Sequence, residues 1–144
     1  MQHVYNCIGH ELKLPDIVGS EGGYIVDCCG KRYLDLESGV WCMSVGHNHA
    51  DVRKAALSQW DELVHAGFAY SSQIVESAAK RLLDVVGMQD GQCVFLCSGS
   101  EAIEVSRQMA RHLTGFETSL TFSDSYLGAY SSVDDRRVGW CTLD

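Results

Sequence analysis

The residues with the clearest chemical potential form the short turn Ser98-Gly99-Ser100-Glu101-Ala102, between an apolar run and a helical pattern. The first turn of a helix leaves backbone N–H groups unpaired and carries a partial positive charge. A glycine at that point lets a ligand approach the backbone closely. We therefore predict that the N–H groups of Gly99 and Ser100, together with the Ser100 hydroxyl, hold an anion.

The same turn also fits a helix cap that needs no ligand. Ser98 followed three residues later by Glu101 has the pattern of a capping box. The two interpretations are compatible, because the box uses only some of the unpaired donors. The turn lacks the Gly-Lys-Ser/Thr of a P-loop and the Gly-x-Gly-x-x-Gly of a dinucleotide fingerprint, so it belongs to neither of those nucleotide-binding classes.

Hydrophobic periodicity predicts the elements that position this turn. Helices are predicted over residues 50–65, 74–86 and 102–113, ended by Gly67, Gly87 and Gly115. The apolar run Cys93–Cys97 predicts a strand buried on both faces, and residues 118–122 predict another strand. Strand, turn, helix and strand make one crossover unit of a parallel sheet, and ligands bind at the carboxyl ends of such strands. The fold class is therefore α/β.

The N-terminal third predicts a β-hairpin. Residues 24–26 and 32–36 favour strands and flank Cys29-Gly30-Lys31, where glycine supplies the turn. Residues 1–19 lack a clear period and predict an irregular arm, and residues 38–49 and 123–144 are also expected to be irregular. Trp60 falls on the apolar face of its helix and is expected in the core, as are Cys93 and Cys97.

Composition narrows the function classes. The chain has 144 residues, a formal net charge of −8 and basic residues only in scattered pairs, which disfavours nucleic acid as a partner. Its apolar runs are too short to span a membrane. Seven cysteines match no disulfide framework and no apolar stretch follows Met1, so we expect reduced thiols and a cytoplasmic protein. Several histidines and cysteines lack zinc-ligand spacing, and no metal site is predicted.

Four stretches, in order, resemble the class III aminotransferases, which use pyridoxal 5′-phosphate (PLP) and have the fold of type I PLP enzymes. Residues 98–102 resemble the family's phosphate-binding turn. Residues 22–35 resemble its N-terminal hairpin, and Ser38-Gly39-Val40-Trp41-Cys42 with Gly46-His47-Asn48-His49 resembles the segment along its substrate pocket. Ser125-Tyr126-Leu127-Gly128 resembles its Tyr-His-Gly motif. The resemblance covers residues 19–132.

This resemblance implies roles for four residues. Gly99 and Ser100 would bind the cofactor phosphate, Tyr126 would stack on its pyridine ring, and Trp41 would line the substrate pocket. Leu127 stands where the family usually has histidine, so a polar role at that position is lost. Residues 1–49 would form the N-terminal arm, hairpin and pocket segment, and residues 50–144 the first, incomplete part of the PLP-binding large domain.

The family's chemistry also needs a lysine that forms a Schiff base with PLP. None of the sequence's lysines matches that motif; they are Lys13, Lys31, Lys54 and Lys80. The resemblance implies that this lysine lies beyond residue 144 and that this chain alone holds no catalytic residue. The family's aspartate for the pyridine nitrogen and its substrate-carboxylate arginine are also expected there, so Arg136 and Arg137 are not assigned that role.

The implied function is transfer of an amino group between an amine or amino acid and a keto or aldehyde acceptor, by an enzyme that is a homodimer when complete. Trp41 is consistent with an apolar or aromatic amine. Two alternatives stay open: a non-catalytic fragment that binds PLP or another phosphate compound, and a degenerate partner subunit in which the turn is only a cap.

Overall fold

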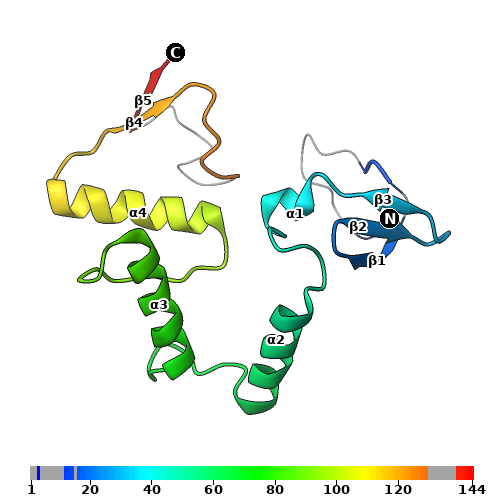
Figure 1. Ribbon diagram of the computed structural model, residues 1–144. Coiled ribbons are helices and arrows are strands. Elements are labelled where there is room, and N and C mark those ends of the chain that lie inside the picture. Colours follow the sequence, from blue (N-terminus) through cyan, green and yellow to red (C-terminus); the bar gives the residue numbers. More distant parts are fainter. Residues whose placement is uncertain (1–2, 4–11, 15, 130–138) are drawn as a thin grey trace. The chain divides into compact units, whose positions relative to one another are not determined.

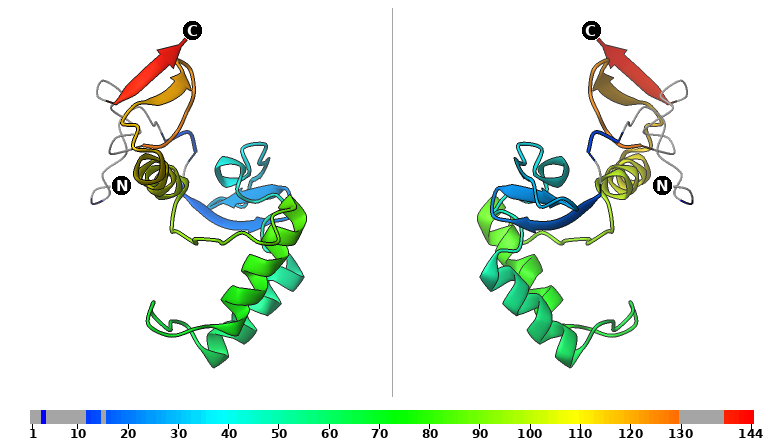
Figure 2. Two further views of the ribbon diagram at one scale, coloured as in Figure 1. Left: turned by 90° about the vertical axis from the view of Figure 1, so that its left-hand side faces the viewer. Right: turned by 90° about the vertical axis from the view of Figure 1, so that its right-hand side faces the viewer.

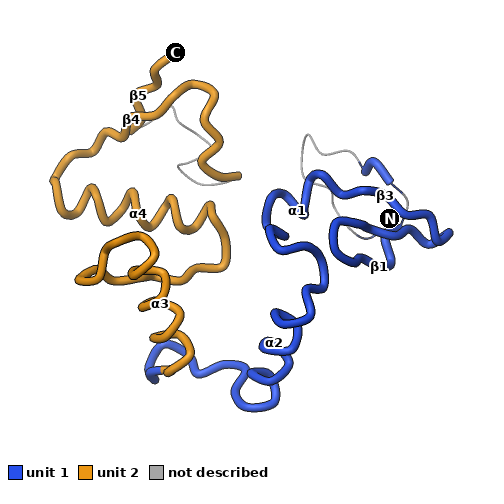
Figure 3. The backbone as a smooth tube through the Cα atoms, in the orientation of Figure 1, with its two compact units in different colours: residues 1–71 blue, residues 72–144 orange. Residues whose placement is uncertain are grey.

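A computed structural model describes residues 3, 12–14, 16–129 and 139–144 (Figure 1). The chain separates into two compact units, Met1–Ser71 and Ser72–Asp144 (Figure 3). The predicted boundary at residue 49 follows the family resemblance and stays a prediction. Arg136 and Arg137 lie outside the described residues.

The first unit contains a three-stranded antiparallel sheet in the order β1-β2-β3. Its strands are β1 (Ile17–Glu21), β2 (Tyr24–Asp27) and β3 (Arg32–Leu34). The β2–β3 hairpin confirms the predicted one, with Gly30 in the turn at φ +81°. The prediction of an irregular arm through residue 19 was wrong at its end, because β1 begins at Ile17. The register between β1 and β2 shifts between Ile17 and Gly19, and this irregularity breaks the two-residue period that would have revealed the strand.

Asp27 organises the turn of this hairpin. Its side chain is buried (4% exposed), and one carboxylate oxygen accepts hydrogen bonds from the N–H groups of Cys29 and Lys31, both at 2.9 Å. The other oxygen accepts from the Tyr33 hydroxyl at 2.9 Å. The Lys31 hydrogen bond is the largest influence on this group, and although burial opposes it, the pKa of Asp27 lies below its ordinary value.

The short helical turn α1 (Ser38–Trp41) and three longer helices follow the first sheet. The longer helices are α2 (Ala50–Glu62), α3 (Gln73–Val86) and α4 (Gly99–Thr114). Gly87 and Gly115 end α3 and α4 in the left-handed conformation, as predicted. The prediction that the first helix reaches His65 was wrong. It stops at Glu62 because Leu63 turns to extended backbone, and the Gln59 side-chain amide donates to the Leu63 carbonyl at 2.9 Å.

The predicted buried strand over Cys93–Cys97 does not form. Val94 and Phe95 are 62% and 53% exposed, and this segment pairs with no other strand among the described residues. A strand exists only through hydrogen bonds to neighbouring strands, so a strand-like sequence without such neighbours stays irregular. The expected burial of Trp60 was also wrong, since Trp60 is 69% exposed and no residue of α2, α3 or α4 is buried. Cys97 is likewise exposed, and Cys93 is half-buried.

The second unit ends in two parallel strands, β4 (Ser119–Phe122) and β5 (Trp140–Leu143), which lie side by side in both views of Figure 2. β4 confirms the predicted strand, whereas β5 lies in a tail expected to be irregular. Arg107 of α4 joins these strands to the helix: its Nε donates to Ser119 Oγ at 2.9 Å, and its guanidinium lies 5.0 Å from the centre of the Trp140 ring. No helix in the described ranges is both long and apolar enough to cross a membrane.

Acid should loosen the β2–β3 turn through Asp27. Its pKa is lower in the folded chain than the unfolded value of about 3.9, so its stabilisation is present above that pH and is lost as pH falls through the folded pKa. We expect amide exchange at Cys29 and Lys31, corrected for intrinsic rates, to accelerate below about pH 4. NMR exchange rates measure this.

The matched variants are Asp27→Asn and Asp16→Asn. Asparagine at position 27 keeps an oxygen that can accept from both N–H groups but cannot titrate, so the acid acceleration should disappear. Asp16 is exposed, and its backbone carbonyl accepts from the Cys28 N–H, which the side-chain substitution does not remove, so Asp16→Asn should retain the acceleration. Equal acid sensitivity in both variants would contradict the role of Asp27.

Candidate functional site

The first turn of α4 is capped as the sequence predicts. Ser98 has extended backbone angles, and its Oγ accepts from the Glu101 N–H at 3.2 Å. The Glu101 carboxylate accepts from the Ser98 hydroxyl, also at 3.2 Å, so the two side chains of the predicted capping box contact each other. The Ala102 N–H donates to the Ser98 carbonyl at 3.1 Å, which begins the helical ladder.

Two donors of this turn remain available. The backbone N–H groups of Gly99 and Ser100 bind no acceptor in the part of the chain that the structure describes. A Cβ at Gly99 would meet nothing within 4 Å, and Gly99 has no positive φ, so neither packing nor backbone conformation requires glycine here. Open space beside two adjacent N–H donors at a helix N-terminus is what an anion needs.

The segment that contains Tyr126 is fastened to this helix start. The Ala129 N–H donates to Ser100 Oγ at 3.1 Å. Gly128, which lies between Tyr126 and Ala129 in the chain, is buried and has φ +151°. This bond uses the Ser100 oxygen as acceptor and leaves the hydroxyl proton available to donate. The Tyr126 ring is 78% exposed. The structure thus joins Gly99, Ser100 and the Tyr126 segment in one unit, across 29 residues of sequence.

Trp41, the fourth predicted residue, belongs to the first unit and ends the short helical turn α1 (Ser38–Trp41). All four residues of α1 have φ between +50° and +62°, so the turn is left-handed. Trp41 N–H donates to the Glu37 carbonyl at 2.8 Å and Cys42 N–H to the Ser38 carbonyl at 3.0 Å. Left-handed backbone costs about 1–2 kcal/mol for each residue other than glycine. The turn therefore stores strain that its surroundings must offset.

Asp35 caps this left-handed turn. Its Oδ1 accepts from the N–H groups of Glu37 and Ser38, at 3.1 and 3.0 Å. Its Oδ2 lies 2.7 Å from His47 Nε2, and both side chains are largely buried. The His47 hydrogen bond is the largest influence that holds the pKa of Asp35 below its ordinary value. The contribution of this carboxylate is therefore lost only when pH falls through that lowered pKa.

From the sequence, Asp35 was assigned no role of its own, and His47 was named only within the stretch that resembles the segment along the substrate pocket. A signal existed, because Asp35 stands three residues before Ser38 and short polar side chains cap turns at that spacing. The pairing with His47 spans 12 residues and had no local signature.

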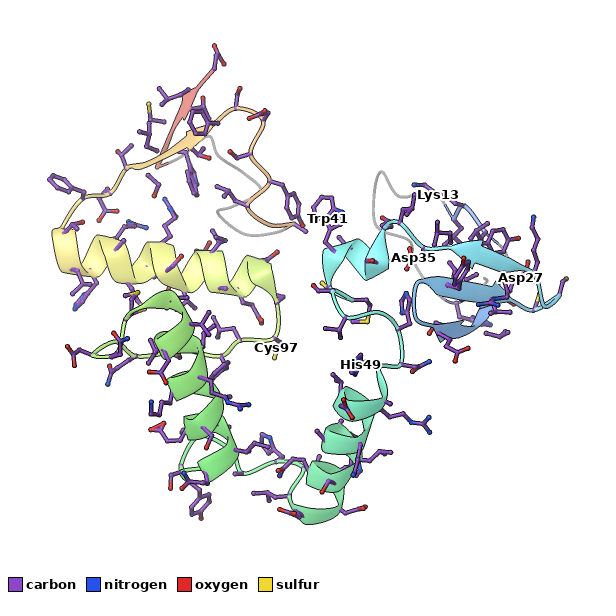
Figure 4. All side chains as sticks on the ribbon, viewed as in Figure 1. Lys13, Asp27, Asp35, Trp41, His49 and Cys97 are labelled. Carbon is purple, nitrogen blue, oxygen red and sulfur yellow. The ribbon has the colours of Figure 1, made fainter. Side chains whose placement is uncertain are left out.

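The other chemical groups form no competing centre. Among residues 12–14, 16–129 and 139–144, no cluster of three histidine, cysteine or acidic side chains could hold a metal ion. All four lysines lie in the described ranges, and Lys80 alone belongs to the same unit as the α4 turn. Lys80 pairs with Asp84 at 2.7 Å along α3, and Lys31 lies 4.7 Å from the centre of the Tyr33 ring. Figure 4 places Lys13 in the first unit.

Comparison with known proteins identifies the family. Residues 9–132 match the model of the class-III aminotransferases. The chain is 32% identical over 108 residues to an acetylornithine aminotransferase of Archaeoglobus fulgidus, covering 75% of this chain and 28% of that protein. It is 35% identical over 130 residues to an acetylornithine aminotransferase of Listeria innocua, covering 89% and 32%.

Comparison of the structure with solved structures identifies the same family. It superposes on an amine transaminase from an uncultivated Pseudomonas species, solved in its PLP-bound form, with a TM-score of 0.84 and 26% identity, over 100% of this chain and 38% of that one. The chain belongs to the class III aminotransferases, and its fold is part of the fold of the PLP-dependent transaminases. It spans about a third of the length of these relatives.

The cap of α4 predicts a stability effect that is separate from ligand binding. Ser98→Ala removes the acceptor for the Glu101 N–H and should destabilise α4 by about 1 kcal/mol, as measured by urea unfolding or by amide exchange in the first turn. Ser98→Asp keeps an acceptor and should retain most of the stability. Ser77→Ala, in which a hydroxyl that donates to Gln73 within α3 is lost, is the matched control and should leave α4 unchanged.

Proposed function

We propose that this chain forms the N-terminal segment and the first part of the cofactor-binding domain of a PLP-dependent aminotransferase. The enzyme would move an amino group between an amine or amino acid and a keto or aldehyde acceptor. The observation that carries the proposal is the first turn of α4, where two adjacent N–H groups and the Ser100 hydroxyl can donate beside the open space at Gly99.

The donor set fits the phosphate of PLP. A phosphate dianion accepts several hydrogen bonds, and hydrogen bonds to a charged group are stronger than neutral ones. Gly99 and Ser100 would contribute backbone N–H groups and Ser100 a hydroxyl, with the dipole of the 16-residue helix α4 oriented to favour the negative charge. The bond from Ala129 fixes the position of the Ser100 oxygen.

The remaining site residues would position the reacting groups. When bound, PLP supplies an electron-withdrawing ring that makes amino-group transfer possible. Tyr126, whose segment is anchored to Ser100, would provide the flat surface that holds this ring, which suits its exposed side chain. Trp41 would bound the substrate pocket and favour an apolar or aromatic amine. We assign residues 1–49 to the arm, hairpin and pocket segment, and residues 50–144 to the large domain.

The complete catalytic centre requires residues from outside this chain. None of the four lysines matches the family's Schiff-base motif, and Lys80 pairs with Asp84. The lysine that carries the cofactor is therefore proposed to come from another part of the enzyme. We also propose a homodimeric, cytoplasmic enzyme; the family resemblance supports the first property and the cysteine pattern of the sequence supports the second.

Cofactor binding by the chain itself tests the proposal. In titrations with PLP followed by calorimetry, Ser100→Ala should weaken binding by about tenfold or more, because a hydrogen bond to a charged group is lost. Gly99→Val should weaken it at least as much by filling the open space, while the helix persists because Gly99 has no positive φ. Inorganic phosphate should compete with PLP.

Ser106→Ala is the matched control, since Ser106 lies further along α4 and donates to the Ile103 carbonyl. It should bind PLP as the unmodified chain does. Binding that is unaffected by Ser100→Ala and Gly99→Val would contradict the proposed phosphate site. Binding without any amino transfer, even beside a lysine-bearing relative, would favour a non-catalytic binding fragment.

A further inference from the structure

Residues 35–47, here called the Trp41 loop, are closed at both ends on the β1–β2 connection. The Asp35 N–H donates to the Gly23 carbonyl at 2.9 Å. His47 N–H donates to the Gly22 carbonyl at 2.7 Å, and Gly22 N–H donates back to the His47 carbonyl at 3.0 Å. The two residues that end the loop are thus attached to two adjacent glycines.

Close backbone contact makes this closure tight. A Cβ on Gly46 would lie 3.1 Å from the Gly22 carbonyl oxygen and 3.2 Å from its Cα, and Gly46 has φ +87°. Only glycine satisfies both the space and the conformation at that position. The backbone bonds fix where the loop begins and ends, but they do not reach the strained turn in its middle.

The Asp35 side chain provides that missing connection. One oxygen holds the Glu37 and Ser38 N–H groups, which start the left-handed turn, and the other holds His47 at the far end of the loop. In Figure 4 Asp35 lies between α1 and the hairpin, and Trp41 extends from the opposite end of α1. Three residues other than glycine keep positive φ in this turn, which requires a surrounding that determines them strongly.

We propose that Asp35 and His47 are positioning residues that fix the left-handed turn and thereby the direction of the Trp41 indole; the consequence for substrate choice rests on the proposed function, in which Trp41 lines the pocket. Neither side chain touches the substrate in this scheme. Asp35 sets the conformation of the turn, and His47 orients the Asp35 carboxylate so that one oxygen faces the two N–H groups.

Hydrogen exchange in the full chain tests directly whether Asp35 and His47 fix the left-handed turn. Asp35→Ala and His47→Ala should accelerate exchange of the Trp41, Cys42 and Met43 amides, all donors within the turn, by roughly tenfold, the effect of losing one net hydrogen bond. Asp35→Asn and His47→Gln keep an oxygen acceptor and a nitrogen donor at these places and should restore most of the protection. Asp61→Ala and His65→Ala, on exposed positions of the same unit, are the controls.

A second measurement reports on the indole itself. With Trp60→Phe and Trp140→Phe as background, Trp41 is the single tryptophan, and its time-resolved anisotropy reports its local motion. Asp35→Ala should increase the amplitude of that motion, and Asp35→Asn should not. In the complete enzyme, which would include the proposed lysine from outside this chain, Asp35→Ala should raise the KM for the amine about tenfold when PLP is bound. The change in kcat should be smaller.

The outcomes separate this proposal from the proposed function. Faster exchange in the turn without any PLP binding would support the role of Asp35 and His47 and would contradict the proposed cofactor site. PLP binding together with unchanged exchange and anisotropy in Asp35→Ala would overturn the proposed positioning role of Asp35 and His47. Equal loss of protection at the β2 and β3 amides and at the turn would also overturn it, because the pair would then support the whole hairpin rather than position Trp41.

Discussion

Unpaired backbone donors at the start of α4 are the constraint on which the candidate site in the second unit depends. Ser98 satisfies one N–H, and Ala129 approaches the Ser100 oxygen, so two neighbouring donors face open space without protein acceptors in the described chain. Gly99 is exposed and Ser100 is half-buried, so water as well as an anion can reach these N–H groups. We propose that an anionic ligand completes this turn, and the phosphate of PLP has a suitable charge.

Local signals predicted local structure well. The hairpin at Gly30, the cap at Ser98 and the helix ends at Gly87 and Gly115 each depend on residues a few positions apart, and each was found where the sequence placed it. The four residues assigned by resemblance remain predictions as binding residues, although the structure joins three of them through the Ala129 bond. The Asp35–His47 pair was not predicted from the sequence, because its two residues are brought together only by the closure of the Trp41 loop.

Failures of prediction concern elements that depend on distant neighbours. A buried strand over residues 93–97 was a sound inference from an apolar run, but the neighbouring strands it requires are not among the described residues. The same holds for the apolar faces of the helices, where Val52, Trp60 and Leu82 are 58%, 69% and 49% exposed. The chain spans about a third of its relatives' length, and a helix face of this kind is covered only by further elements of a fold. Amphipathic patterning identified the faces but could not supply what covers them.

The left-handed turn at residues 38–41 links pocket chemistry to backbone preference. Asparagine, aspartate and glycine adopt positive φ at lower cost than β-branched or bulky residues. If Trp41 lines the substrate pocket as proposed, its replacement would therefore change two quantities together: the space in the pocket and the strain of the turn. Replacement by glycine or asparagine would enlarge the space beside the turn and relieve its conformational strain, whereas isoleucine or valine would reduce the side chain but increase the strain. Under that proposal, substrate preference and local folding at this position are coupled, and variants selected for one property would carry a bias in the other.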